Sequence, residues 1–170
     1  MDTWNTITSR RQVRSFTSDL IPKKDFELIL EAGRRAPSSR NGQRWDFVVV
    51  SDKGRLDRLS RVWQGAAFIT DSKATIALIV PQVEGDEALV DRLDLGQAAM
   101  QIMIAATGFG IGSGQAVCRD QTLAQKVLGF PDGRLCALLI ALGYPMDRPL
   151  KPIQEPSRRD FDDVVHFETW

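Results

Sequence analysis

The stretch Ala36-Pro37-Ser38-Ser39-Arg40-Asn41-Gly42-Gln43-Arg44-Trp45 leads directly into Asp46-Phe47-Val48-Val49-Val50. The first part is rich in the proline, glycine and short polar residues of loops, and the second favours a strand. We predict that a helix stops at Pro37 and that a buried strand begins at Trp45. Ser, Asn and Gln side chains beside a rigid strand suit hydrogen bonds to the rim of a planar ring. Taken alone, however, the segment is explained better as an ordinary helix-to-strand loop.

Capping residues and hydrophobic periodicity predict the elements on either side. Upstream, an apolar stripe indicates a helix that opens at Ile21-Pro22; its members are Phe26, Ile29, Leu30 and Gly33. Further helices are expected after Asp2 or Thr3, from Asp52, over 86–107, from Asp120 to about Gly129, and after Asp160, with Asp163 in the capping-box position. Strands are expected over 75–80, 114–118 and 135–142. The last is continuously apolar, which is typical of a sheet centre.

The predicted helix over 86–107 carries small side chains on one side, which would let another backbone approach closely. Ala98, Ala99, Ile102 and Ala106 are therefore a candidate dimer contact, and Gly108 is expected to end the helix. The glycine run 108–114 follows a helix and precedes an extended segment. This order is the reverse of a dinucleotide-binding loop, which we exclude.

Arginines cluster at two distant places in the chain. In Arg10-Arg11-Gln12-Val13-Arg14-Ser15-Phe16, a spacing of four would place Arg10 and Arg14 on one face of a helix. Two like charges there repel each other unless an anion joins them, so a phosphate site and a solvated helix end are equally good explanations. For Arg11 alone we prefer the solvated helix end. The second cluster is Ser157-Arg158-Arg159-Asp160-Phe161.

Composition narrows the class of protein. The 170 residues include 22 basic and 22 acidic side chains, which argues against a general nucleic-acid binder. No apolar run is long enough for a membrane helix, and the N-terminus lacks the apolar region of a signal peptide. Two cysteines make a poor disulfide framework, so we expect a cytoplasmic protein.

The residues of hydrolytic and metal chemistry are sparse. His166 is the only histidine, and Cys118 and Cys136 lack the spacing of metal ligands. We therefore expect no metal site and no catalytic side chain. The chemistry is expected to belong to a cofactor.

Five segments in this order resemble the FMN-dependent nitroreductase family. The family's opening pattern Arg-Arg-Ser-x-Arg-x-Phe is similar to residues 10–16, and Ala-Pro-Ser-Ser-x-Asn-x-Gln-Pro-Trp is similar to 36–45. A long helix followed by glycines matches 95–114, and Leu-Gly-Tyr-Pro matches 142–145. The tail pattern Arg-Lys-Pro-Leu-Glu-Glu-Val-Val-His resembles 158–166, so the resemblance covers nearly the whole chain.

The resemblance implies an α+β fold with a central, mostly antiparallel sheet flanked by helices, in an intertwined homodimer. It implies one FMN-binding domain over 1–170, with 143–170 as a C-terminal arm and tail. FMN would pass electrons from NAD(P)H to a nitroaromatic, quinone or similar small acceptor. The implied partners are a second copy and this acceptor, with no nucleic acid and no membrane.

The resemblance also implies site residues. Arg10, Arg11, Gln12 and Arg14 would bind FMN, Arg10 at the phosphate together with Arg158 or Arg159, and Arg14 near the N1–C2 carbonyl edge. The backbone at Val117 and Cys118 would approach N5. The other subunit would line the ring and ribityl chain with Pro37, Ser38, Ser39, Asn41 and Gln43.

Three departures from the family pattern leave alternatives open. Gln12 replaces serine, Arg44 replaces proline, which leaves the loop less rigid, and only 81–85 connect a strand to the long helix where many relatives carry a lid. The alternatives are a non-catalytic FMN-binding dimer for storage or sensing, and a relative specialised for enone reduction or flavin fragmentation. A third is a structural dimer without cofactor.

Overall fold

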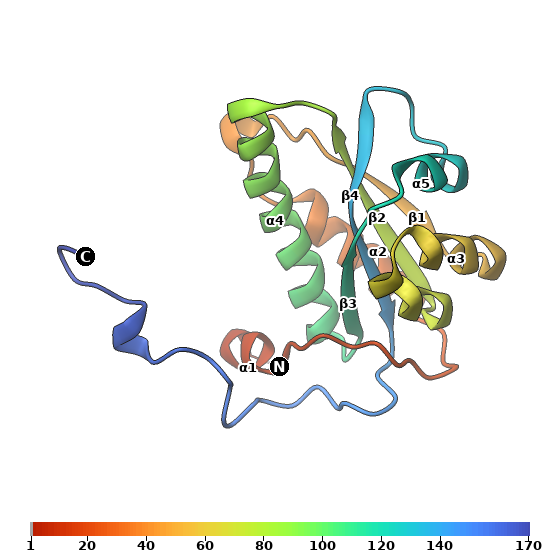
Figure 1. The fold of residues 1–170 in the computed structure, drawn as a ribbon. Coiled ribbons are helices and arrows are strands. Elements are labelled where there is room, and N and C mark those ends of the chain that lie inside the picture. The colour runs from red at the N-terminus through yellow and green to blue at the C-terminus, as the bar shows by residue number, and fades with distance from the viewer. Residues whose placement is uncertain (1) are drawn as a thin grey trace.

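A four-stranded antiparallel sheet lies at the centre of the computed structural model, which describes residues 2–170 (Figure 1). The strands are β1 (Asp46–Val50), β2 (Ala74–Pro81), β3 (Gly112–Val117) and β4 (Arg134–Gly143), in the order β1-β2-β4-β3. The apolar run predicted at the sheet centre is β4, which pairs with β2 on one side and β3 on the other.

Helices cover both faces of this sheet. α2 (Lys23–Arg34) and α4 (Gly85–Gly108) lie on one side, and α3 (Lys53–Leu59) and α5 (Gln121–Leu128) lie on the other (Figure 1). Asp52 and Asp120 cap α3 and α5 as predicted, because each carboxylate accepts a 2.8 Å hydrogen bond from a backbone N–H of the first turn. The α+β fold with a helix-flanked antiparallel sheet is confirmed.

Each face of the sheet has its own apolar core. Ile29 of α2 and Ile102 of α4 pack on Ile76, Leu78 and Ile140 of the sheet. On the opposite face, α3, α5 and a 3₁₀ segment (Gln64–Asp71) pack on Leu139 of β4. Their buried side chains include Leu56, Leu59, Ile69 and Val127. Because both faces are covered, β2 is buried over almost its whole length.

Strand β1 differs from its prediction as a buried strand. It is an edge strand with a single neighbour, and Val49 is 42% exposed. An apolar run marks a strand but does not tell whether a second strand lies beyond it.

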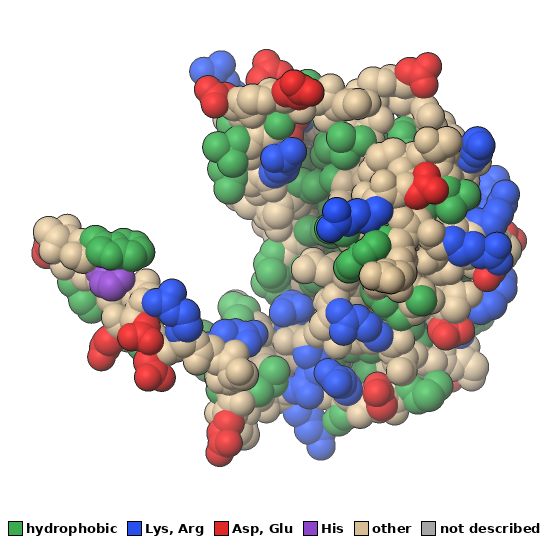
Figure 2. Space-filling view, viewed as in Figure 1, with side chains coloured by type: hydrophobic (Ala, Val, Ile, Leu, Met, Phe, Trp, Pro, Cys, Tyr) green, Lys and Arg blue, Asp and Glu red, His purple; other side chains and the backbone are tan. Residues whose placement is uncertain are grey.

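The predicted dimer face of α4 is wrong. Ala98, Ala99, Ile102 and Ala106 are all nearly inaccessible because they face α2 and the sheet of the same chain. The close approach is real, since a Cβ on Gly33 of α2 would lie 2.6 Å from Ile102 Cγ1. The face of α4 that stays exposed is a different one, which carries Leu89, Leu93 and Met100 (Figure 2).

Two predicted helix ends also differ. Gly108 is still helical, and the left-handed residue that follows α4 is Gly110, with φ of 74°. After Asp160 the chain forms only a 3₁₀ turn, Phe161–Asp163, and the Asp160 side chain makes no capping hydrogen bond. The capping-box pattern has no function there because no α-helix follows it.

Residues 10–16 form an extended segment, which we call the N-terminal strip, and not the helix end that was predicted. Helix α1 (Thr3–Ser9) stops before it, and the Val13 N–H donates to the Ser113 carbonyl of β3 at 2.9 Å. Val13 is fully buried against Gly112 and Gly114. A side chain on Gly114 would collide with the Val13 carbonyl and the Phe68 ring.

The C-terminal arm, residues 143–156, runs back along this strip. Met146 N–H donates to Ser15 O at 3.0 Å, and Ile153 N–H donates to Thr8 O at 3.1 Å. The tail, residues 157–170, then leaves the body of the protein (Figure 1). Its Phe161, Phe167 and Trp170 are largely exposed.

Gly114→Ala is expected to lower the free energy of unfolding by about 1–3 kcal/mol, because the new methyl group meets backbone that cannot move aside cheaply. Thermal or urea unfolding measures this change. Gly96→Ala is the matched control, since a Cβ there meets no atom within 4 Å and alanine favours a helix by about 1 kcal/mol. Equal stability of wild type and Gly114→Ala would contradict the close approach of the N-terminal strip to β3.

Candidate functional site

The N-terminal strip places three polar side chains on one side of an extended chain. Successive side chains of an extended segment alternate, so Arg10, Gln12 and Arg14 share the side opposite the buried Val13. Gln12 Nε2 donates to the Gln115 carbonyl at 2.8 Å, and the Arg14 guanidinium lies 5.7 Å from the centroid of Phe68. Within residues 2–170, neither the Arg10 nor the Arg14 guanidinium has a hydrogen-bond or ion-pair partner. Two such arginines suit an anion.

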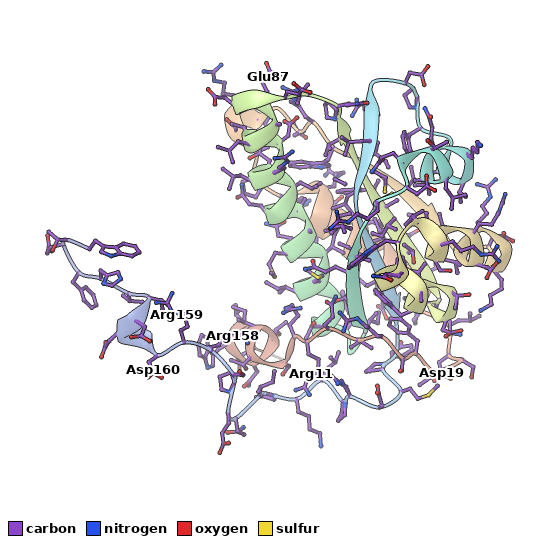
Figure 3. All side chains as sticks on the ribbon, in the orientation of Figure 1. Arg11, Asp19, Glu87, Arg158, Arg159 and Asp160 are labelled. Carbon is purple, nitrogen blue, oxygen red and sulfur yellow. The ribbon has the colours of Figure 1, made fainter. Side chains whose placement is uncertain are left out.

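Arg11 points elsewhere. Its guanidinium donates to the Lys151 carbonyl at 2.6 Å and to the Ser9 carbonyl at 3.4 Å, so it holds the C-terminal arm against the strip (Figure 3). The structure therefore gives the two neighbouring arginines different surroundings. Arg10 is available to a ligand, whereas Arg11 is already used by backbone.

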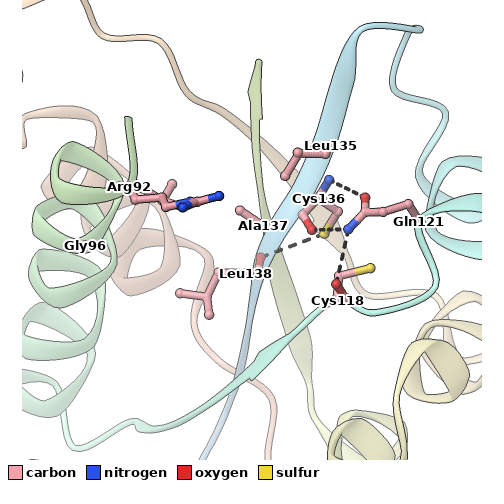
Figure 4. A pocket seen from close by; sticks show the side chains of 9 residues that line it. Arg92, Gly96, Cys118, Gln121, Leu135, Cys136, Ala137 and Leu138 are labelled. Atoms are coloured by element: carbon pink, nitrogen blue, oxygen red, sulfur yellow. Dashed lines mark hydrogen bonds between the residues drawn. The ribbon is translucent and has the colours of Figure 1, made fainter. Parts of the chain in front are cut away.

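A pocket of about 400 Å³ opens at the far end of β3, where the strand stops beside β4. Cys118 lies on its wall, next to the exposed Val117, and Arg92 of α4 points into it (Figure 4). Gly96 of α4 also lines it, and the lack of a side chain there leaves the space open. The N-terminal strip therefore lies beside the start of β3, and this pocket lies at the end of the same strand.

Inside this pocket, the Gln121 side chain forms hydrogen bonds with the backbone of β4. Its Nε2 donates to the carbonyls of Cys136 at 2.8 Å and Cys118 at 3.2 Å, and its Oε1 accepts from the Cys136 N–H at 2.8 Å (Figure 4). The side-chain amide thus takes the place of the strand residue that β3 no longer supplies. Sequence reasoning missed Gln121 and Arg92. Gly96, a glycine inside a predicted helix, was the only available signal for the pocket.

The two thiols of the pocket perturb each other. A hydrogen bond from Cys136 holds the pKa of the Cys118 thiol below its usual range. The same hydrogen bond, together with burial, raises the pKa of Cys136 well above its usual range.

The loop of residues 37–43 lies away from this edge, beside the N-terminal half of α4. Ser39 N–H donates to Asp94 at 2.9 Å, and Gln43 N–H donates to Ser38 Oγ at 3.0 Å. Arg44 forms ion pairs with Asp91 and Glu87, both at 3.3 Å. Arg44 therefore ties the loop down, contrary to the expectation that its replacement of proline loosens it.

The same loop carries backbone strain. Arg40, Asn41 and Gln43 have φ of 52°, 56° and 47°, in the left-handed region that favours glycine. Such strain persists where surrounding contacts fix it, and it gathers at binding sites. Pro37, Ser39, Asn41 and Gln43 are nonetheless exposed and contact no part of the N-terminal strip in their own chain.

The tail arginines stay apart from the strip as well. Arg158 and Arg159 are exposed on the projecting tail, where each donates only to a nearby backbone carbonyl (Figure 3). The structure thus places the strip that carries Arg10, Gln12 and Arg14 beside β3, and Val117 and Cys118 at the far end of that strand. It leaves the loop and the tail arginines outside this group.

Among residues 2–170, His, Cys, Asp and Glu side chains form no group of three that could hold a metal ion. In the same part of the chain, none of the helices has the length and apolar character needed to cross a membrane.

Comparison with known proteins identifies the family. The model of the nitroreductase family matches residues 7–83. A protein from Archaeoglobus fulgidus, provisionally named an NADH dehydrogenase/NAD(P)H nitroreductase, is 30% identical over 96% of both chains. This chain belongs to the nitroreductase family.

Other nitroreductase relatives agree with this result. The FMN reductase [NAD(P)H] of Bacillus subtilis is 25% identical over 96% of this chain and 72% of its own length. A solved structure from Bacteroides thetaiotaomicron, provisionally named an NADH dehydrogenase/NAD(P)H nitroreductase, has a TM-score of 0.85 at 26% identity and covers 99% of this chain and 98% of its own. The resemblance to the nitroreductase family and the nitroreductase fold are therefore confirmed.

Proposed function

We propose that this member of the nitroreductase family is an FMN-dependent oxidoreductase that takes electrons from NAD(P)H and passes them to a nitroaromatic, quinone or similar small acceptor. The observation that carries the proposal is the N-terminal strip, which presents two unpaired arginines beside β3. The names of the Bacillus and Archaeoglobus relatives support the choice of cofactor and of electron donor.

The residues present fit the charge of FMN. Its phosphate needs strong cationic donors, and the free guanidinium of Arg10 provides one without a competing carboxylate in the strip. Its ring needs a flat, open surface, and the edge of β3 leads from the strip to the pocket at Cys118. When bound, FMN supplies the electron-transfer chemistry, while the protein binds it, orients it and sets its electrostatic surroundings.

Each residue along the edge has a proposed part. Arg10 binds the phosphate, and Gln12 adds an amide that is already oriented by its hydrogen bond to Gln115 O. Arg14 places a positive charge beside the ring, held there by the Phe68 face. The backbone of Val117 and Cys118 contacts the ring at the pocket end.

A second copy of the chain would complete the site. The loop residues Pro37, Ser38, Ser39, Asn41 and Gln43 have no role at the strip of their own chain, so we assign them to the flavin of a partner. We also assign Arg158 or Arg159 to the phosphate, and residues 1–170 to one FMN-binding domain with 143–170 as its arm and tail.

Exposed apolar groups support this dimer. Leu89, Leu93 and Met100 follow each other along the outer face of α4, and Phe161, Phe167 and Trp170 project from the tail. A stripe of this kind on a helix that faces solvent marks an interaction surface. We propose that the α4 stripe packs against a second copy and that the tail lies along it.

The acceptor side of the proposed site is open. Only residues 82–84 separate β2 from α4, so no lid covers the pocket from this connection. An open pocket suits acceptors of several shapes. It is also compatible with the alternative of a dimer that holds FMN without turnover.

Steady-state oxidation of NADH and NADPH, with menadione or nitrofurazone as acceptor, tests the function. The purified protein is expected to be yellow and to oxidise at least one of the two nucleotides faster than the same concentration of free FMN. A yellow protein with no rate above free FMN would support storage or sensing instead. A colourless protein that does not rebind FMN would contradict the flavin site itself.

Arg10→Ala is expected to weaken FMN binding by roughly 1.5–3 kcal/mol, the scale of a hydrogen bond between charged groups. Fluorescence titration of the apoprotein with FMN measures this loss. The matched control is Arg11→Ala, which should change the affinity much less because the Arg11 guanidinium is occupied by backbone carbonyls. Unchanged affinity in Arg10→Ala would remove Arg10 from the phosphate site.

Leu93→Arg is expected to lower the dimer population and the FMN occupancy together, because it puts a charge in the middle of the α4 stripe. Leu93 is 63% exposed, so the substitution costs the isolated chain little. Sedimentation velocity with detection at the flavin absorbance follows both quantities at once. Ala67→Arg, exposed on the opposite side of the sheet, is the control. A Leu93→Arg dimer with full FMN occupancy would rule out this face.

A further inference from the structure

Cys118 and Cys136 lie on the same face of the sheet because β4 contains a bulge. The pairing with β2 shifts between Leu78–Leu138 and Ile79–Cys136, so Ala137 is an extra residue in β4. Ala137 and Leu138 both pack on the α4 side, whereas Cys136 turns to the α3 and α5 side. Cys118 packs against that same side.

The strand register brings the two residues together. Val117 of β3 pairs with Leu138 of β4, and Cys118 is the next residue along the chain. Continued by one residue, this register places Cys118 opposite Ala137, the bulge residue next to Cys136, on a strand about 4.8 Å away. Gln121 Nε2 donates to the carbonyls of both cysteines, and both thiols line the same pocket, where Cys118 Sγ lies 3.5 Å from the Asp120 carbonyl and Cys136 Sγ lies 4.0 Å from the Leu138 carbonyl.

The two sulfur atoms differ in access. Cys136 is completely buried, while Cys118 is partly exposed and lines the pocket of about 400 Å³. The more accessible thiol is also the one whose pKa is lowered, by its hydrogen bond from Cys136. An accessible thiol beside a buried thiol is the arrangement of a thiol pair that exchanges with disulfides.

We propose that Cys118 and Cys136 are a redox-active dithiol that reduces small organic disulfides entering this pocket. The Cys118 thiolate attacks one sulfur of the ligand, the ligand S–S bond breaks, and one thiolate leaves and takes up a proton. The Cys136 sulfur then attacks Cys118 and gives up its proton, which the second ligand thiol carries away. The two cysteines lose two electrons to form one disulfide, and one ligand disulfide becomes two thiols.

This reaction does not require the electrons of FMN, although it takes place in the pocket that the proposed flavin site adjoins. Arg92 points into the same pocket, where its positive charge suits a departing thiolate. Gln121 is a positioning residue, since it holds the two backbone segments in register.

Incubation of the full-length protein with bis(2-hydroxyethyl) disulfide, followed by alkylation and intact mass measurement, tests the proposal. We expect wild type to lose the mass of two hydrogens and to retain no hydroxyethylthio group. Peptide mapping should show a Cys118–Cys136 link that dithiothreitol reverses. Cys136→Ala should instead retain one hydroxyethylthio group on Cys118, because the second step is blocked, and Cys118→Ala should stay unmodified.

The wild-type result decides the proposal even if a variant folds poorly. A wild-type protein that keeps two free thiols, or that keeps the hydroxyethylthio group on Cys118 without forming the link, would overturn it. Near-UV circular dichroism before and after treatment shows that the reaction takes place in the folded protein. A link that forms only after denaturation would also count against the proposal.

Discussion

The close approach of the N-terminal strip to β3 is the constraint on which the rest of the arrangement depends. Gly112 and Gly114 leave room for Val13, so the strip can lie flat along the strand and pair with Ser113. This packing leaves the Arg10 and Arg14 guanidinium groups without a hydrogen-bond or ion-pair partner among residues 2–170, and it provides the surface along which the C-terminal arm runs back. Removing the space at Gly114 would disturb the basic side chains, the arm and the edge of the sheet together.

Much of the fold could be read from local pattern. The continuous apolar run became β4, and the aspartates at 52 and 120 cap helices, because these signals depend only on neighbouring residues. The small residues around Ala99 correctly predicted that another element packs closely against this helix. They could not tell whether the contact belonged to the same chain or to another, because side-chain size states only how near a neighbour comes. The helical placement of Arg10 failed because tertiary pairing with β3 overrode it.

The candidate site, like the fold, could be predicted from the sequence only in part. Arg10 and Arg14 still share a side in the extended chain, but four residues span about 13 Å there, whereas a helix would bring them within about 6 Å of each other. The importance of Gln121 depends on where β3 stops beside β4, which no local pattern records. The ion pairs of Arg44 with α4 depend on how two distant segments pack. The sequence could therefore predict several residues along β3, but it could not predict the role of Gln121 at the end of that strand.

The pairing of the N-terminal strip with the C-terminal arm has a consequence for biosynthesis. Met146 N–H donates to Ser15 O and Ile153 N–H donates to Thr8 O, so these contacts join segments that are more than 130 residues apart in the sequence. The strip also needs β3, which follows about one hundred residues later. Contacts this distant in sequence require the closure of a long loop and form slowly. The strip therefore has no partner until β3 has been synthesised, and the arm can join it only after that.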